Sequence, residues 1–253
     1  MFTPHTAHRF LVLLASLGGA FSVSLNGADP LPSDEEGFEP PVLEQPVPLL
    51  IPQQILHVSS DWDSAIVRMR IGAEGEIEDW IPLDLPHYKL VEAFDRAFAR
   101  TRFSPARENG EAIAVELTAS IPIRDASGYR ILSETLSEHI ESRLARINPG
   151  RYRLVVSPPS QLDEPLEVIA EGTRYVAVDE SGNALEGTVT VEFYVDPEGV
   201  PRMIRVAGDP DPVVGEAAVL TVSELRFAPP RRNHNPTVVR ARMPVVLGGG
   251  TSD

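Results

Sequence analysis

A short motif occurs twice in this chain of 253 residues. Arg102–Arg107 reads RFSPAR and Arg226–Arg231 reads RFAPPR, so Phe103 and Phe227 are 124 residues apart. Two further pairs keep the same separation upstream: Glu74-Gly75 with Glu198-Gly199, and Glu92-Ala93 with Glu216-Ala217. A period of this length is too long for a solenoid unit and is typical of a duplicated small domain. The repeat therefore predicts two domains with separate cores.

The first copy shows hydrophobic patterns of both strand and helix. Apolar residues alternate with other residues over 65–71, which predicts a strand with one buried face. A turn over 73–76 leads to a second strand over 77–81. Apolar residues then recur at helical spacing, so an amphipathic helix over 88–100 is predicted to pack on this sheet. A final strand is predicted over 112–121.

The second copy repeats this order with clearer signals. A strand over 189–195 is followed by Asp196–Gly199, whose sequence DPEG strongly favours a turn. A partner strand over 201–206, a helix over 213–225 and a last strand over 237–246 complete the copy. The predicted fold class is therefore α+β, with two small domains. Each domain is a short antiparallel sheet in the order β-β-α-β with a helix packed on one face.

The segments outside the two copies differ from them in composition. Basic residues precede the apolar run Phe10–Leu25, which is typical of a cleaved export signal; the alternative is a membrane anchor. A tether rich in proline and acid follows, and an amphipathic helix over 132–147 connects the copies. The predicted boundaries are 1–28 for the signal peptide, 29–54 for the tether, 55–124 for copy 1, 125–164 for the connecting segment, 165–247 for copy 2 and 248–253 for a disordered tail.

Composition and motifs argue against several kinds of site. The formal net charge is −15, whereas binding to nucleic acid or to anionic membranes favours a basic surface. The chain has no cysteine, which excludes disulfides, thiolate metal sites and a lipoprotein anchor. Its six histidines lack metal-ligand spacing, and no glycine-rich phosphate loop is found. We therefore predict no catalytic residue, no metal and no cofactor.

Three runs of the second copy carry a resemblance to a known family: Gly187–Gly199, Glu216–Ala218 and Arg226–Pro229. Their order is strand, glycine-containing turn, second strand, helix, Phe-x-Pro and last strand. This pattern resembles the C-terminal domain of TonB, the bacterial energy transducer. The first copy resembles the domain less fully, through Ile71–Glu76 and Arg102–Pro105. The resemblance implies a tandem pair of TonB C-terminal-like domains.

The resemblance also implies a binding site. In the family, the edge of the last strand binds an extended peptide segment of an outer-membrane receptor, which joins the sheet as an added strand. A second edge of this kind is Ala114–Ile121. Two alternatives stay open: the edges pair with each other, or linker strands cover them. The implied partner-binding residues are Val238, Val239, Arg240, Ala241, Arg242, Met243 and Val245.

These observations predict an exported, non-enzymatic protein that is periplasmic or secreted. It is expected to be an adaptor that binds an extended peptide segment of another envelope protein, such as an outer-membrane receptor. One alternative is a TonB-type energy transducer, held in the inner membrane by a single uncleaved N-terminal anchor. The other is a self-associating structural protein, a homodimer in the simplest case. Contact with a membrane is expected only if the N-terminal segment is not cleaved.

Overall fold

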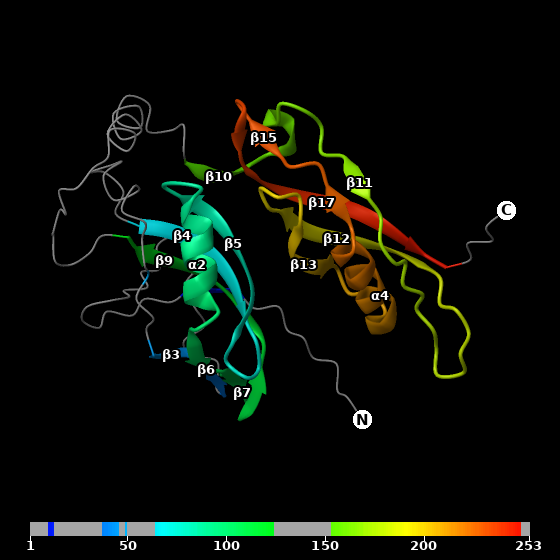
Figure 1. The fold of residues 1–253 in the computed structure, drawn as a ribbon. Coiled ribbons are helices and arrows are strands. Elements are labelled where there is room, and N and C mark those ends of the chain that lie inside the picture. Colours follow the sequence, from blue (N-terminus) through cyan, green and yellow to red (C-terminus); the bar gives the residue numbers. More distant parts are fainter. Residues whose placement is uncertain (1–9, 13–36, 46–48, 50–63, 124–152, 249–253) are drawn as a thin grey trace, which may run out of the picture. The chain divides into compact units, whose positions relative to one another are not determined.

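The computed structural model describes residues 10–12, 37–45, 49, 64–123 and 153–248. The chain divides into two compact units (Figure 1). We call them the N-terminal unit, within His5–Val155, and the C-terminal unit, within Val156–Asp253. Most of the predicted signal peptide, tether and tail, and the predicted helix over 132–147, lie outside the described residues. The described residues are mainly strands with two α-helices, which confirms the α+β class.

The N-terminal unit is built on a three-stranded antiparallel sheet. Its strands are β4 (Ser64–Ile71), β5 (Ile77–Leu85) and β9 (Val115–Pro122), in the order β9-β4-β5. Helix α2 (Leu90–Phe98) covers one face of this sheet, as Figure 1 shows. Alternation in β4 directs Val67 and the other buried residues of that strand to the helix side, as the period of two predicts.

Aromatic side chains fill the space between sheet and helix in this unit. The Trp80 ring on β5 lies 5.1 Å from the Phe98 ring and 5.8 Å from the Phe94 ring, measured between centroids. The indole Nε1 of Trp80 donates a hydrogen bond of 2.8 Å to Asp95 on α2, so the one polar atom of the ring is satisfied. These contacts fix α2 against β5.

Short strands extend the N-terminal unit around this core. Those that follow α2 are β6 (Arg102–Ser104), β7 (Ala106–Glu108) and β8 (Glu111–Ile113). Those from the N-terminal part of the chain are β1 (Phe10–Val12), which pairs with β9 in parallel, β2 (Phe38–Glu39), which pairs with β7, and β3 (Val42–Gln45), which pairs with β6. The proline-rich segment therefore contributes two strands that pair with this unit.

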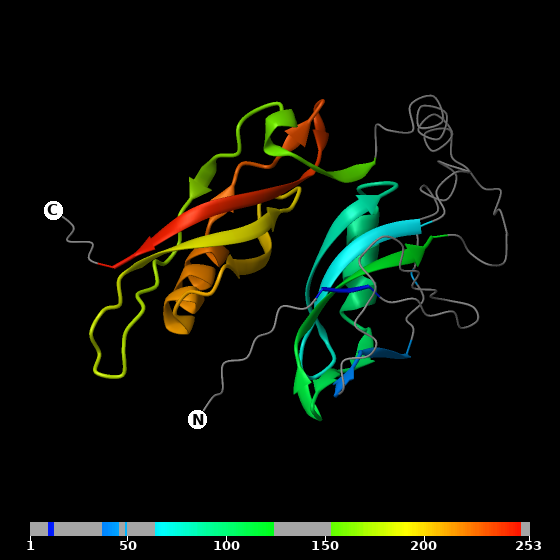
Figure 2. The ribbon, with the colours of Figure 1, turned by 180° about the vertical axis from the view of Figure 1, so that it is seen from behind.

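The C-terminal unit repeats the same architecture. Its strands β12 (Gly187–Val195), β13 (Pro201–Ala207) and β17 (Val238–Leu247) are antiparallel, in the order β13-β12-β17. Helix α4 (Pro212–Ser223) packs on one face of this sheet (Figure 1), and Figure 2 shows the opposite face. The Asp211 carboxylate caps α4 by accepting hydrogen bonds from the amides of its first turn, and Pro212 occupies a helix start that needs no amide donor.

Short elements complete the C-terminal unit. They are the end of β10 (Leu154–Ser157), the 3-10 helix η2 (Pro159–Gln161), β11 (Val168–Ala170), β14 (Arg226–Phe227), β15 (Arg231–Arg232) and β16 (Asn235–Pro236). Strand β11 pairs with β14, and β15 pairs with β16 as a hairpin. The chain passes from one unit to the other within β10, whose first residues pair with β5 and whose last residues pair with β17.

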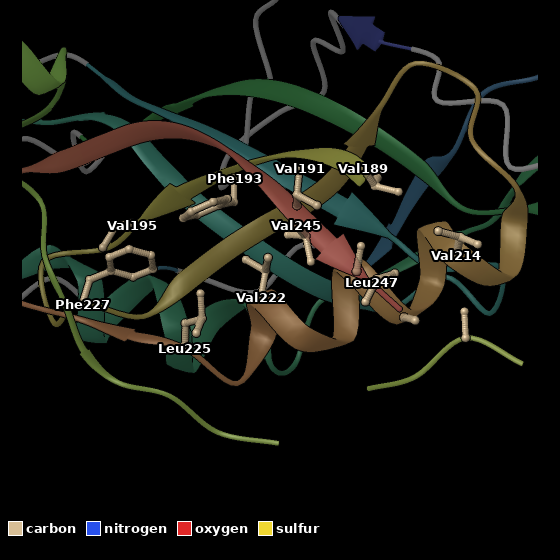
Figure 3. Close-up of a cluster of buried hydrophobic side chains, with 13 residues drawn as sticks. Val189, Val191, Phe193, Val195, Val214, Val222, Leu225, Phe227, Val245 and Leu247 are labelled. Atoms are coloured by element: carbon tan, nitrogen blue, oxygen red, sulfur yellow. The ribbon is translucent and has the colours of Figure 1, made fainter. Parts of the chain in front are cut away.

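The core of the C-terminal unit lies between the sheet and α4 (Figure 3). Every second residue of β12 from Val189 to Val195 is buried in it, which is the alternation predicted from the sequence. The Phe193 and Phe227 rings lie 5.5 Å apart between centroids. Phe227, from the repeated motif, is therefore a core residue that joins the segment after α4 to the central strand.

Most predicted elements coincide with observed ones, and the differences lie at their ends. Strand β5 extends to Leu85, four residues beyond the predicted end. The strand predicted over 112–121 is two strands, because β8 turns back to pair with β7 before β9 begins at Val115. Helix α2 is shorter than predicted at both ends. Such shifts are expected, because the final turns of a helix and the ends of a strand depend on tertiary packing.

Candidate functional site

The last strand of the C-terminal unit has one side fully paired and one side mostly open. On the inner side, β17 pairs with β12 from Val239 to Leu247. On the outer side, β10 pairs in parallel at Val238 and Val239. No described strand pairs with the outer side from Arg240 to Leu247. We call this stretch the open edge.

The predicted partner-binding residues divide at this point. Val238 and Val239 pair with β10, which belongs to the connecting segment. At these two residues a linker strand therefore covers the edge, as one of the alternatives predicted. The remaining five residues lie on the open edge: Arg240, Ala241, Arg242, Met243 and Val245. From Arg240 onward, no described strand occupies the position that a partner strand would take.

Pro244 indicates which backbone amides point outward. Proline has no N–H, so within a sheet it is found where that N–H would face away from the neighbouring strand. Pro244 lies opposite Thr190 of β12, in the middle of their pairing. Successive residues of a strand direct their amides to alternate edges. The amides of Arg240, Arg242 and Val246 therefore point to the open edge, and those of the residues between them serve the pairing with β12.

The side chains of β17 alternate between two different environments. Those that face α4 are apolar and buried or half-buried; they are Val239, Ala241, Met243, Val245 and Leu247. Those on the opposite face are exposed; they are Arg240, Arg242, Pro244 and Val246. A strand added to this edge would also have two faces, one beside apolar groups and one beside arginines.

A groove of about 520 Å³ adjoins the open edge on the α4 side. It is lined by the end of β17 from Met243 onward, by Thr221, Val222 and Leu225 near the end of α4, and by residues of the segment 168–176. A hydrogen bond of 3.2 Å from the Tyr175 amide to the Thr221 hydroxyl holds that segment to α4. Val176, in the lining, is 62% exposed. Glu171 and Arg174 also line the groove, so its wall combines apolar and charged side chains.

Arginines surround a single carboxylate on the other face. Glu192 of β12 contacts Arg205 at 2.6 Å, Arg240 at 3.2 Å and Arg242 at 3.8 Å. The hydrogen bond from Arg205 is the largest of the causes that lower the pKa of Glu192, and a hydrogen bond from Arg240 adds to it. Three guanidinium groups and one carboxylate carry two positive charges in excess. This face of the open edge is therefore basic, although the chain as a whole is strongly acidic.

The second predicted edge, in the N-terminal unit, is different. At Glu116–Thr118 the outer side of β9 pairs with β1 in parallel. Glu116 lies 124 residues before Arg240, and its buried carboxylate forms a salt bridge of 2.8 Å with Arg70. The edge of β9 therefore lacks the two arginines that characterise the edge of β17. Strand β1, which pairs with part of it, lies within the predicted signal peptide 1–28, so removal of that peptide would also remove this pairing.

Two other kinds of site are absent from the described residues. Within them, no group of three His, Asp or Glu side chains could hold a metal ion. Nor does any described helix have the length and apolar character needed to cross a membrane. The groove was not foreseen from the sequence, because Val176 and its neighbours carry no motif. Only folding brings 168–176 beside β17 and α4.

Comparison with known proteins identifies one part of the chain. Residues 180–246 match the family model described as the Gram-negative bacterial TonB protein C-terminal. The match runs from the turn before β12 to Val246 of β17, and so includes the open edge apart from Leu247. Searches of curated proteins and of solved structures gave no match. The matched region, about a quarter of the chain, is therefore similar to the C-terminal domain of TonB, a family whose domains interact with outer-membrane receptors.

Proposed function

We propose that the protein is a non-enzymatic periplasmic adaptor that binds an extended peptide by strand addition to β17. The observation that carries this proposal is the open edge from Arg240 to Leu247 in the region that matches the family. Main-chain hydrogen bonds along such an edge supply affinity, and side-chain pockets beside it supply selectivity. Here the groove beside Met243 and Val176 is the pocket. The partner is an extended segment of another envelope protein, such as an outer-membrane receptor.

We also propose that the N-terminal unit is a second copy of the same fold. Strands β4 and β12 end 124 residues apart, and β5 and β13 begin 124 residues apart. One long-range contact is repeated as well. The Phe103 amide donates to the Gly75 carbonyl at 2.8 Å, and the Phe227 amide donates to the Gly199 carbonyl at 2.9 Å. Equivalent hydrogen bonds at equivalent positions support duplication of a domain.

The first test replaces a backbone amide of the open edge. Arg242→Pro removes an N–H that points outward and leaves the hydrogen bonds to β12 in place, as the native Pro244 does two residues later. Arg242→Ala is the matched control, because it removes the same side chain and keeps the N–H. We expect Arg242→Pro to bind an extended partner peptide about tenfold more weakly than Arg242→Ala, since one hydrogen bond and the close approach of the strand are lost.

The measurement is the dissociation constant for peptides from the periplasmic segments of outer-membrane receptors, followed by fluorescence anisotropy. Circular dichroism of both variants checks that the sheet is intact. Equal affinities for the two variants would contradict strand addition at this edge and would move the binding site elsewhere on the unit.

The adaptor and the anchored transducer differ in what happens to the N-terminus. We expect the protein recovered from its native cells to be water-soluble and to begin near Phe21 or Asp29, after removal of an export signal. Intact mass and partition between membrane and soluble fractions measure this. A full-length species in the inner membrane would contradict the adaptor and favour the transducer.

A further inference from the structure

We infer that the open edge selects an extended peptide that is acidic on one face and apolar on the other. This inference rests on the proposed function and specifies the partner's chemistry. Its basis is the difference between the two faces of the edge: exposed arginines on one face and the groove on the other. An added strand presents alternate side chains to those two faces.

The charge on the first face is available to a partner. The side chains of Arg240 and Arg242 are 55% and 64% exposed. Glu192 is the one described carboxylate that contacts them, and it is also bound to Arg205 at 2.6 Å. A strand paired with the open edge places its side chains within about 5 to 8 Å of those on β17, directly opposite or diagonally. Glutamate or aspartate at every second position of the peptide would therefore lie close to Arg240 and Arg242, whose charge is offset by Glu192 alone among the described carboxylates.

The second face selects for apolar side chains. Residues of the added strand that point toward α4 would enter the groove, beside Met243, Val176 and Leu225. Burial of these side chains would also cover Val176, which is the kind of exposed apolar surface that a partner removes from water. A peptide with valine or isoleucine at every second position and acidic residues between them matches both faces.

The same arginines disfavour pairing between two copies of the chain. In an antiparallel pair of open edges, arginines of one β17 would lie opposite or diagonal to arginines of the other, and like charges at such positions destabilise a sheet. The acidic peptide is therefore the occupant that the charge of the edge favours over a second β17.

The experiment compares three synthetic peptides on the full chain. Each is as long as the open edge and has valine at every second position, and the intervening residues are all Glu, all Gln or all Lys. We expect the Glu peptide to bind about three- to thirtyfold more tightly than the Gln peptide at low salt, and the Lys peptide to bind most weakly. Raising the salt to about 1 M should remove most of the difference, because the screening length falls to about 3 Å.

Two variants assign the selectivity to particular residues. R240Q/R242Q should bind the Glu peptide no better than the Gln peptide. Arg231→Gln, on the β15–β16 hairpin, is the control and should keep the preference. Glu192→Gln should increase affinity for the Glu peptide, because it removes the carboxylate that competes for the arginines. A variant that failed to fold could not show such an increase.

The outcomes separate this inference from the proposed function. Equal binding of all three peptides would overturn charge selection and would leave strand addition standing. A preference for the Lys peptide, or a Glu preference that survives R240Q/R242Q, would also overturn the inference. Binding of none of the peptides would overturn both proposals. Self-association of R240Q/R242Q without any change in peptide preference would identify the arginines as a block against aggregation instead.

Discussion

Gly199→Ala is expected to destabilise the C-terminal unit by at least about 3 kcal/mol. Gly199 has a φ of +85°, in the left-handed region, where an alanine costs about 1–2 kcal/mol. A Cβ added at this position would also collide with the carbonyl oxygen of Phe227. The collision would break the hydrogen bond from the Phe227 amide to the Gly199 carbonyl, which adds a further loss.

The fluorescence of the chain makes this prediction specific. Its two tryptophans, Trp62 and Trp80, both precede the C-terminal unit in the sequence, and Trp80 lies in the core of the N-terminal unit. If the units have separate cores, tryptophan emission of Gly199→Ala should keep its denaturant midpoint, while far-ultraviolet circular dichroism gains an earlier transition. A single transition, shifted equally in both signals, would contradict separate cores.

The matched control for this substitution is Gly208→Ala. Gly208 has nearly the same φ, +86°, but a Cβ there would meet no atom within 4 Å. The control should therefore show the cost of left-handed backbone alone, about 1–2 kcal/mol. An equal loss from Gly208→Ala and Gly199→Ala would show that the contact with Phe227 contributes nothing.

The N-terminal unit is expected to lose up to about 3 kcal/mol of stability as the pH falls from about 6.5 to about 4. His87 precedes α2 and is 5% exposed, and its Nδ1 accepts a hydrogen bond of 3.1 Å from the Lys89 amide. Burial, followed by the nearby charge of Lys89, lowers the pKa of His87 to about 4. Protonation would remove the acceptor that this amide uses and would leave a charge in a buried site.

The loss of stability at low pH follows from proton uptake on unfolding. In the unfolded chain the pKa of a histidine is about 6.5, so between pH 6.5 and 4 the unfolded state binds more protons than the folded state. Stability is therefore full above about pH 6.5 and is lost as the pH falls toward 4. Each pKa unit corresponds to about 1.4 kcal/mol, so the full difference between pKa values of about 6.5 and about 4 is worth about 3.4 kcal/mol, of which about 3 kcal/mol is lost by pH 4.

The measurement is denaturant unfolding followed by tryptophan emission at several pH values. His87→Asn is the control, because an Asn side-chain oxygen can replace Nδ1 as acceptor and does not titrate in this range. The variant should show little change in stability between pH 6.5 and 5. A wild-type protein whose N-terminal unit is equally stable at pH 7 and pH 4.5 would contradict the prediction.

Local sequence patterns determined most of the secondary structure. Alternation over 189–195 predicted β12, and helical spacing over 88–100 predicted α2, because these periods record which face of an element is buried. The repeated Phe-x-Pro motif and the glycine turns predicted the equivalence of the two copies. The physical reason for the motif was not visible in sequence: Gly199 and Phe227 contact each other across 28 positions only once the chain has folded.

The residue pattern of the last strand predicted a strand, and the family resemblance predicted that its edge binds a peptide. The local pattern of 237–246 was enough to predict an extended strand whose side chains alternate in polarity. Three features of the edge depend on residues that are distant in sequence. Strand β10 pairs with Val238 and Val239, and the segment 168–176 forms a groove beside Met243. The carboxylate of Glu192 contacts three arginines, which are Arg205, Arg240 and Arg242. Tertiary structure alone decided these features, because the register between strands and the packing of loops set which residues meet.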